Sequence, residues 1–283
     1  MENSLNRLTS KDYWNETWSG VKLPAIVERD ESNAVIGDGI DAAVIDIFDR
    51  FFPRDSKVTV LELGGAPGRF LAYCACRYGC SVHSLDYSDI GCKVTIENFR
   101  QLNLPVTVYQ QDIFDTSKPI GQFDVVFSLG LIEHFEDTKQ IIERHWQMVK
   151  PGGLLILGVP HFVHVFWPVL EIVAPNVTRG HNRDALVLEK WSTWETSLQM
   201  KAVYKAYLGG FDPMFIRSMI KEERSCYKAS RPILSNSLEF GLRCFGAVRR
   251  RARQVFPRLD FLDRINGSWA SSYAIGVYQR MTR

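Results

Sequence analysis

The chain has 283 residues, of which 46% are hydrophobic and 23% charged, and its formal net charge is +2. This composition is ordinary for a globular protein with one large core and some insertions. The small net charge gives no case for a protein that binds nucleic acid along its whole length. Because residues 1–18 lack the apolar stretch of a signal peptide, we expect a cytoplasmic protein.

Strand-like and helix-like patterns alternate between residues 58 and 159. This rhythm is typical of a parallel sheet with helices on both faces. Gly79 is well placed to end the first of the helices. The predicted strands are residues 58–63, 80–86, 105–112, 124–128 and 154–159, and the predicted helices are 67–78, 89–102 and 137–149.

The pattern changes after residue 160, because residues 161–208 are rich in aromatic side chains. This segment is too long and too apolar for a simple connection, so we expect a mostly helical insertion over the edge of the sheet. A helix is predicted at 213–223. The last two strands of the sheet are predicted near 225–230 and at 271–281, with a second insertion between them at 232–267.

The most informative motif is VTVLELGGAPGRF at residues 58–70. An apolar strand reaches Glu62 and then turns on Gly64, Gly65 and Gly68. Such a turn places backbone N–H groups and the positive end of a helix at the carboxyl edge of a parallel sheet, where a small ligand with a nucleoside and an anionic group can bind. The spacing is neither the dinucleotide fingerprint nor a P-loop, since the glycines or the Gly-Lys-Ser/Thr that these require are missing.

Three further features follow this turn. Asp86 and Asp112 end the second and third strands, and FDVVFSLGLIEHFED at 123–137 precedes VKPGGLLIL at 149–157. Together with ELGGAPG, these features resemble the class I S-adenosylmethionine (SAM)-dependent methyltransferases that act on small molecules. The resemblance implies an α/β, Rossmann-like fold with a seven-stranded, mostly parallel sheet, an antiparallel last strand, helices on both faces and helical insertions.

The resemblance also implies a domain organisation. It covers residues 40–160 well, and we expect one methyltransferase domain at 40–283 with insertions near 161–208 and 232–267. Residues 1–39 are expected to form an N-terminal cap segment over the cofactor, built around Tyr13, Trp14 and Trp18; packing against the edge of the sheet is the alternative.

By this resemblance, SAM is the expected cofactor and S-adenosylhomocysteine the product. Asp86 would accept hydrogen bonds from both ribose hydroxyls, and Asp112 would accept one from the adenine amino group unless it only caps a helix. Tyr87 would lie against the adenine or simply pack in the core. The residues expected to bind the cofactor are Tyr13, Glu62, Gly64, Gly65, Gly68, Asp86, Tyr87, Asp112, Ile113, Leu129 and Gly130.

The expected reaction is an in-line displacement of the methyl group by an oxygen or nitrogen of the acceptor. Glu133 and His134 follow the fourth strand, near the place where the methyl group should project, and His134 suits a general base at neutral pH. His161 and His164 are the other candidates; shaping of the loop is the alternative role for the first pair. Since no spacing of cysteines or histidines forms a recognisable metal set, we expect no metal in the reaction.

The insertions should build the acceptor pocket. Their apolar and aromatic composition favours a small or amphiphilic acceptor, such as a sugar, a lipid-linked compound or another metabolite. Six arginines and no acid lie in 243–258, which predicts either a solvated basic helix or contact with a membrane surface or a phosphorylated acceptor. Two alternatives stay open: a non-catalytic partner subunit and an RNA methyltransferase. Methylation of bases is disfavoured, because SLGLIEHF replaces the usual N/D-PP-Y/F motif.

Overall fold

The fold is described from a computed structural model of the chain. The structure describes residues 7–29, 35–36, 39–55, 57–164, 166–211, 214–227, 236–244, 267–269 and 271–282. Most of the predicted insertion at 232–267, and most of the arginine-rich stretch at 243–258, therefore lie outside the described residues.

Within the described residues, the main sheet has seven strands in the order β5-β4-β3-β6-β7-β9-β8. Strand β9 is antiparallel to both of its neighbours, whereas β3 to β7 run parallel to one another. This arrangement confirms the predicted Rossmann-like sheet with an antiparallel last strand. The bounds are β3 (Thr59–Leu63), β4 (Ser81–Asp86), β5 (Thr107–Gln110), β6 (Phe123–Leu129), β7 (Val149–Pro160), β8 (Ala202–Phe211) and β9 (Ser271–Gln279), beside a separate pair of β1 (Glu28–Arg29) and β2 (Val35–Ile36).

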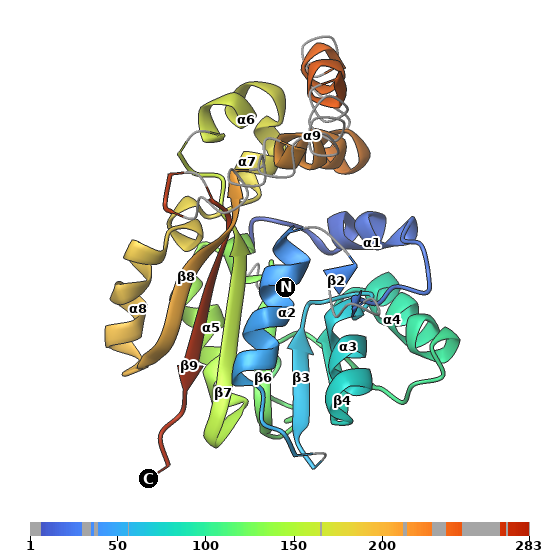
Figure 1. Cartoon of the computed structure of the whole chain (residues 1–283), viewed down its shortest axis with the longest axis vertical. Coiled ribbons are helices and arrows are strands. Elements are labelled where there is room, and N and C mark those ends of the chain that lie inside the picture. Colours follow the sequence, from blue (N-terminus) through green and yellow to red (C-terminus); the bar gives the residue numbers. More distant parts are fainter. Residues whose placement is uncertain are drawn as a thin grey trace.

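Helices cover both faces of the sheet (Figure 1), and each face packs in its own apolar layer. Val125 and Phe127 of β6 pack on one side with helices α2 (Gly39–Phe51), α3 (Arg69–Tyr78) and α4 (Asp89–Gln101). Val126 of β6 packs on the other side with α5 (Thr138–Gln147) and α8 (Ser192–Ser197). The two-residue alternation of a strand, when both faces are buried, accounts for this continuous apolar run.

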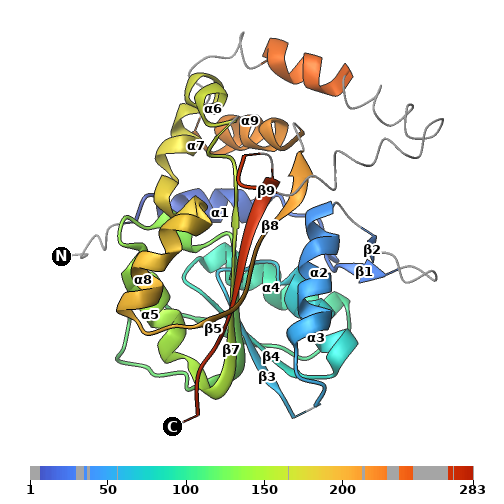
Figure 2. The ribbon, with the colours of Figure 1, turned by 60° about the vertical axis from the view of Figure 1, so that its left-hand side comes forward.

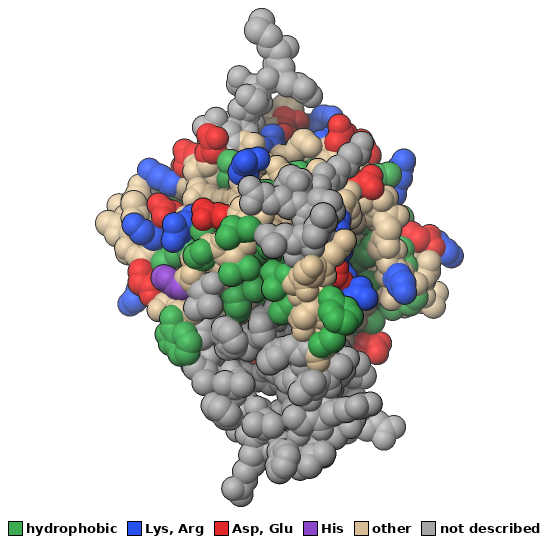
Figure 3. Space-filling model, turned by 90° about the horizontal axis from the view of Figure 1, so that it is seen from above, with side chains coloured by type: hydrophobic (Ala, Val, Ile, Leu, Met, Phe, Trp, Pro, Cys, Tyr) green, Lys and Arg blue, Asp and Glu red, His purple; other side chains and the backbone are tan. Residues whose placement is uncertain are grey.

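Further helices lie above the carboxyl ends of the parallel strands (Figures 1 and 2). They are α1 (Lys11–Ser19), α6 (Trp167–Val173), α7 (Pro175–Arg179) and α9 (Met214–Tyr227), with short 3-10 turns at Ile132–His134, Arg183–Leu186 and Leu188–Trp191. Seen from this end, hydrophobic side chains gather near the middle of the face and charged ones around its rim (Figure 3). None of the described helices has the length and apolar character needed to cross a membrane.

The sixth strand of the sheet lies elsewhere than predicted. Strand β8 is Ala202–Phe211, inside the segment expected to be a mostly helical insertion, whereas residues 225–227 belong to helix α9. The register of β8 is irregular at both ends, which interrupts the alternation that marks a strand. In α9, the buried Ile216, Ile220 and Glu223 keep a helical spacing as far as the end of the segment.

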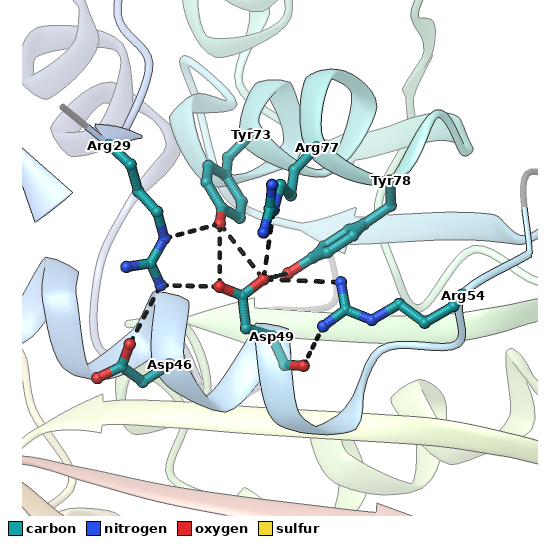
Figure 4. A network of polar contacts seen from close by, with 7 residues as sticks. All are labelled: Arg29, Asp46, Asp49, Arg54, Tyr73, Arg77 and Tyr78. Carbon is teal, nitrogen blue, oxygen red and sulfur yellow. Dashed lines mark hydrogen bonds and ion pairs between the residues drawn. The ribbon is translucent and has the colours of Figure 1, made fainter. Parts of the chain in front are cut away.

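A polar network joins α2 to the end of α3 (Figure 4). Asp49 of α2 accepts hydrogen bonds from Tyr78 Oη at 2.8 Å and from Arg29 at 2.8 Å, and Arg77 lies 3.7 Å from the same carboxylate. Burial by itself raises the pKa of Asp49, but the bonds from Tyr78 and Arg29 outweigh it and hold that pKa below its ordinary value. The network holds α3, and with it the glycine turn before α3, against α2.

Candidate functional site

A cavity opens at the carboxyl ends of β3 and β4. Its position at this edge of a parallel sheet is the usual one for a small-molecule site. It contains four of the predicted cofactor residues and one of the predicted catalytic residues. The lining residues are Arg7, Thr9, Trp14, Trp18, Leu63, Gly64, Leu85, Asp86, Tyr87, Gln111, Ile113, Leu131, His134 and Phe135.

The glycine turn brings backbone close to this cavity. Gly64 has φ +65°, and an added Cβ would lie 2.9 Å from Leu131. At Gly65 an added Cβ would lie 2.1 Å from the Glu62 carboxyl group, so only glycine fits against that side chain. Burial raises the pKa of Glu62 well above its ordinary value, and its Oε2 has no hydrogen-bond partner among the described residues.

Asp86 and Tyr87 carry the polar groups of the β4 side. Asp86 is 5% exposed, and its Oδ1 accepts the Ser88 N–H at 2.8 Å. Burial raises the pKa of Asp86 to about 6. The Tyr87 hydroxyl is buried with no hydrogen-bond partner in the described part of the chain. Buried polar groups normally have hydrogen-bond partners. The unpartnered Tyr87 hydroxyl and Glu62 Oε2 are therefore compatible with a polar ligand near the ends of β3 and β4.

Asp112 is engaged by the N-terminal segment. Arg7 donates to Asp112 Oδ1 at 2.6 Å, and its guanidinium lies 5.0 Å from the centre of the Tyr87 ring and 5.6 Å from that of Phe135. Sequence reasoning missed Arg7, because nothing local to it marks a ligand site.

The N-terminal segment lies over this cavity. The Leu8 N–H donates to the His134 carbonyl at 2.9 Å, and Arg7 pairs with Phe135 in a short antiparallel bridge. Helix α1 then adds Trp14 and Trp18 to the wall of the cavity. Part of the segment predicted as a cap therefore forms one wall of this cavity, and its role as a cap over a cofactor stays a prediction.

A second, larger cavity lies between α1, α9 and the turn after β6. Trp14 and His134 line both cavities, so the two adjoin. Tyr13 lines this second cavity rather than the first, and its hydroxyl donates to Glu222 Oε1 at 2.5 Å. Burial raises the pKa of Glu222 to about 7. Glu222 was not singled out from the sequence, since an acid inside a helix is commonly a solvated residue.

Of the remaining predicted cofactor residues, only Tyr13 and Gly130 line the second cavity. Gly68 precedes α3 with φ +80°, and Leu129 ends β6. Glu62, Gly65, Gly68, Asp112 and Leu129 are not among the described residues that line either cavity.

The predicted catalytic residues lie in different places. Glu133 and His134 line the second cavity, and burial raises the pKa of Glu133 to about 8. Burial, together with the neighbouring His181, holds the pKa of His134 well below its ordinary value. His161 lines neither cavity in the described part of the chain, and both of its ring nitrogens lie within 2.6 Å of backbone carbonyl oxygens, those of Leu186 and Ser268. His164 is exposed.

Comparison with known proteins agrees with this geometry. The family model of the methyltransferase domain matches residues 61–157. A ubiquinone biosynthesis O-methyltransferase of Coxiella burnetii is 29% identical over 99 residues, which cover 35% of this chain and 42% of that protein. The chain thus spans less than half the length of this curated relative.

Solved structures share the fold. A candidate sarcosine dimethylglycine methyltransferase from Galdieria sulphuraria has a TM-score of 0.59 at 11% identity, covering 96% of this chain and 98% of that one. Phosphoethanolamine N-methyltransferase 2 of Haemonchus contortus, in complex with SAM, has a TM-score of 0.54 at 19% identity, covering 84% of this chain and 52% of that one. Residues 61–157 therefore match the methyltransferase domain family, and most of the chain shares the fold of these solved structures.

Proposed function

We propose that the protein is an enzyme that transfers a methyl group from SAM to a small-molecule acceptor. The observation that carries the proposal is the pair of adjoining cavities at the carboxyl edge of the sheet, which share Trp14 and His134. The first cavity has the glycine turn and a buried carboxyl group at Asp86, which suit SAM. The second cavity adjoins the first and would take the acceptor.

The residues of the first cavity would hold the cofactor. Bound SAM supplies a methyl group on a positively charged sulfur. Asp86 would accept hydrogen bonds from a ribose diol, and the free hydroxyl of Tyr87 would bind a further polar atom. Arg7 and Trp18 would exclude water from above. Holding an acceptor in line with the methyl group contributes on the order of several kcal/mol to the rate enhancement.

The second cavity suggests the chemistry of the acceptor. It is lined by aromatic rings, by Met219 and by three acids, the exposed Glu16, the half-buried Glu222 and the buried Glu133, and no lysine or arginine is among its described lining residues. Such a wall favours a neutral or cationic acceptor with a hydroxyl or amino group. The proteins that this chain resembles are named for small molecules, a ubiquinone precursor pathway and phosphoethanolamine, in keeping with a small acceptor.

A lipid-linked or phosphorylated acceptor, with contact to a membrane surface, is the finer expectation from the sequence. It rests on residues 243–258, of which only Arg243 and Cys244 lie in the described part of the chain. For the proton of the acceptor, Glu222 and Glu133 have pKa values of about 7 and about 8, close to the optimum for proton transfer at neutral pH. His134, with its lowered pKa, would be the weaker base.

The test is a calorimetric titration with SAM and with S-adenosylhomocysteine. Wild-type protein is expected to bind both, Asp86→Ala to lose at least tenfold in affinity, and the control Glu143→Ala, which removes an exposed acid of α5, to bind as wild type. Label from methyl-labelled SAM should then appear in hydroxyl or amino acceptors. A folded protein that binds neither ligand would contradict the proposal and favour a non-catalytic subunit, whereas labelling of RNA alone would favour an RNA methyltransferase.

A further inference from the structure

Three buried side chains meet at the wall of the second cavity. Glu133 and His134 lie in the 3-10 turn after β6, and His181 follows the end of α7. One carboxylate oxygen and one nitrogen from each ring all lie within 4.8 Å of one another, and His134 Nε2 is 3.9 Å from Glu133 Oε1. All three residues line the cavity in which the acceptor is proposed to bind.

The hydrogen bonds of the two histidines fix which nitrogen of each neutral ring carries the lone pair. His134 Nδ1 lies 2.7 Å from the Gly180 carbonyl oxygen, and His181 Nδ1 lies 2.6 Å from that of Val177. A carbonyl oxygen only accepts, so each Nδ1 carries the hydrogen and each Nε2 of the neutral ring carries a lone pair. A ring nitrogen tied to a backbone carbonyl, with the other nitrogen free, is the usual arrangement of a histidine that ligates a metal.

The carboxyl group of Glu133 lacks the partners that its burial requires. Glu133 is 1% exposed, and neither of its side-chain oxygens has a hydrogen-bond partner among the residues that the structure describes. A buried carboxylate without a partner is costly, and such groups in proteins are normally paired with a cation or ligate one. Glu222 lines the same cavity and adds a second acid. A cation that ligates Glu133 would supply the partner that its carboxyl group lacks.

We propose that Glu133, His134 and His181 bind one divalent first-row transition-metal ion at the wall of the second cavity. Two imidazole nitrogens and one carboxylate suit ions such as Zn²⁺, Mn²⁺, Fe²⁺ or Co²⁺ better than Ca²⁺ or Mg²⁺, which prefer oxygen ligands. With bonds of about 2.1 Å, ligand atoms stand roughly 3.0–3.5 Å apart. Small side-chain movements would bring the three atoms from their present separation to that range.

The ion would have open positions toward the cavity, because the chain supplies three ligands. A hydroxyl or amino acceptor could fill them, and the ion would then orient its reacting atom and acidify a bound hydroxyl. This step rests on the proposed function, whereas metal binding itself does not. The ligand set also differs from the sequence-based expectation of metal-free chemistry, because His181 stands far along the chain from the other two residues.

The test uses Co²⁺ as the probe on full-length protein freed of metal with a chelator. We expect about one equivalent of Co²⁺ to bind, with visible absorption bands typical of nitrogen and oxygen ligands and no thiolate charge-transfer band. Glu133→Gln, which keeps the shape of the side chain, and His181→Gln should each weaken binding roughly tenfold or more. His164→Ala, the matched control at an exposed histidine, should bind as wild type.

SAM binding is measured in parallel for each variant. A variant that binds SAM is folded, and because SAM binding tests the proposed function whereas Co²⁺ binding tests the metal site, the two hypotheses can fail independently. Wild-type protein that binds SAM but no Co²⁺ would overturn the metal site. So would Co²⁺ binding that is unchanged in both Glu133→Gln and His181→Gln, or a thiolate band, since Cys76 and Cys244 are exposed. Co²⁺ binding by a protein that binds no SAM would leave the metal site standing and contradict the proposed function.

Discussion

Substitution of Gly65 by alanine tests the geometry of the glycine turn. The new Cβ would lie 2.1 Å from the Glu62 carboxyl carbon and 2.4 Å from its Cγ, whereas carbon atoms normally approach to about 3.5–4.0 Å. Because Glu62 is 2% exposed and packed, its side chain must shift by more than about 1 Å. Overpacking of this kind costs about 1–3 kcal/mol. We expect Gly65→Ala to lower the free energy of unfolding by that amount and to weaken SAM binding.

A double-mutant cycle in urea identifies the cause. If the contact with Glu62 is responsible, Gly65→Ala should cost at least about 1 kcal/mol less in a Glu62→Ala background than in the wild type. Gly39→Ala is the matched control, because an added Cβ there meets nothing within 4 Å, and its cost should be near zero. An equal loss of stability in both backgrounds, or a loss at Gly65 no larger than at Gly39, would refute the reasoning.

Three further predictions concern the first cavity and its support. SAM affinity should rise about tenfold from pH 5 to pH 7, because burial raises the pKa of Asp86 to about 6 and a ribose diol binds the ionised form. Calorimetric titrations should show this rise in the wild type and a flat profile in Asp86→Asn. Without ligand, the same raised pKa means that the stability contributed by Asp86 is lost as the pH rises from about 4 through 6, which thermal unfolding across this range would check. Tyr78→Phe should lower the free energy of unfolding, measured in urea, by about 1.5 kcal/mol, since it removes the 2.8 Å hydrogen bond to the Asp49 carboxylate. An unchanged urea midpoint of unfolding would contradict this prediction. Arg7→Ala should speed SAM dissociation in stopped-flow measurements, because it removes the 2.6 Å bond to Asp112, which helps to hold the N-terminal segment over the cavity. An unchanged dissociation rate would mean that the segment does not retain the ligand.

Much of the fold could be predicted because its signals are local. The five parallel strands and the helices between them alternate within short windows, and a strand buried on both faces must be a continuous apolar run. The glycine turn at Gly64 depends on a few consecutive residues. Strand β8 was missed because its pairing comes from β9, more than sixty residues later, and its own alternation is broken by irregular register.

The residues of the candidate site also fall into two groups, those that the sequence pattern predicts and those that only the tertiary structure brings together. Asp86, Tyr87 and Ile113 stand at strand ends, and parallel strands bring their carboxyl ends to one edge, so their convergence follows from the sequence pattern. The sequence also determined that Glu133 and His134 follow the fourth strand. Only the tertiary structure placed Arg7 on Asp112, Glu222 on Tyr13, and His181 beside Glu133. Each of these contacts joins segments far apart in the chain, and packing of helices over the sheet, rather than any local pattern, decides which of them meet.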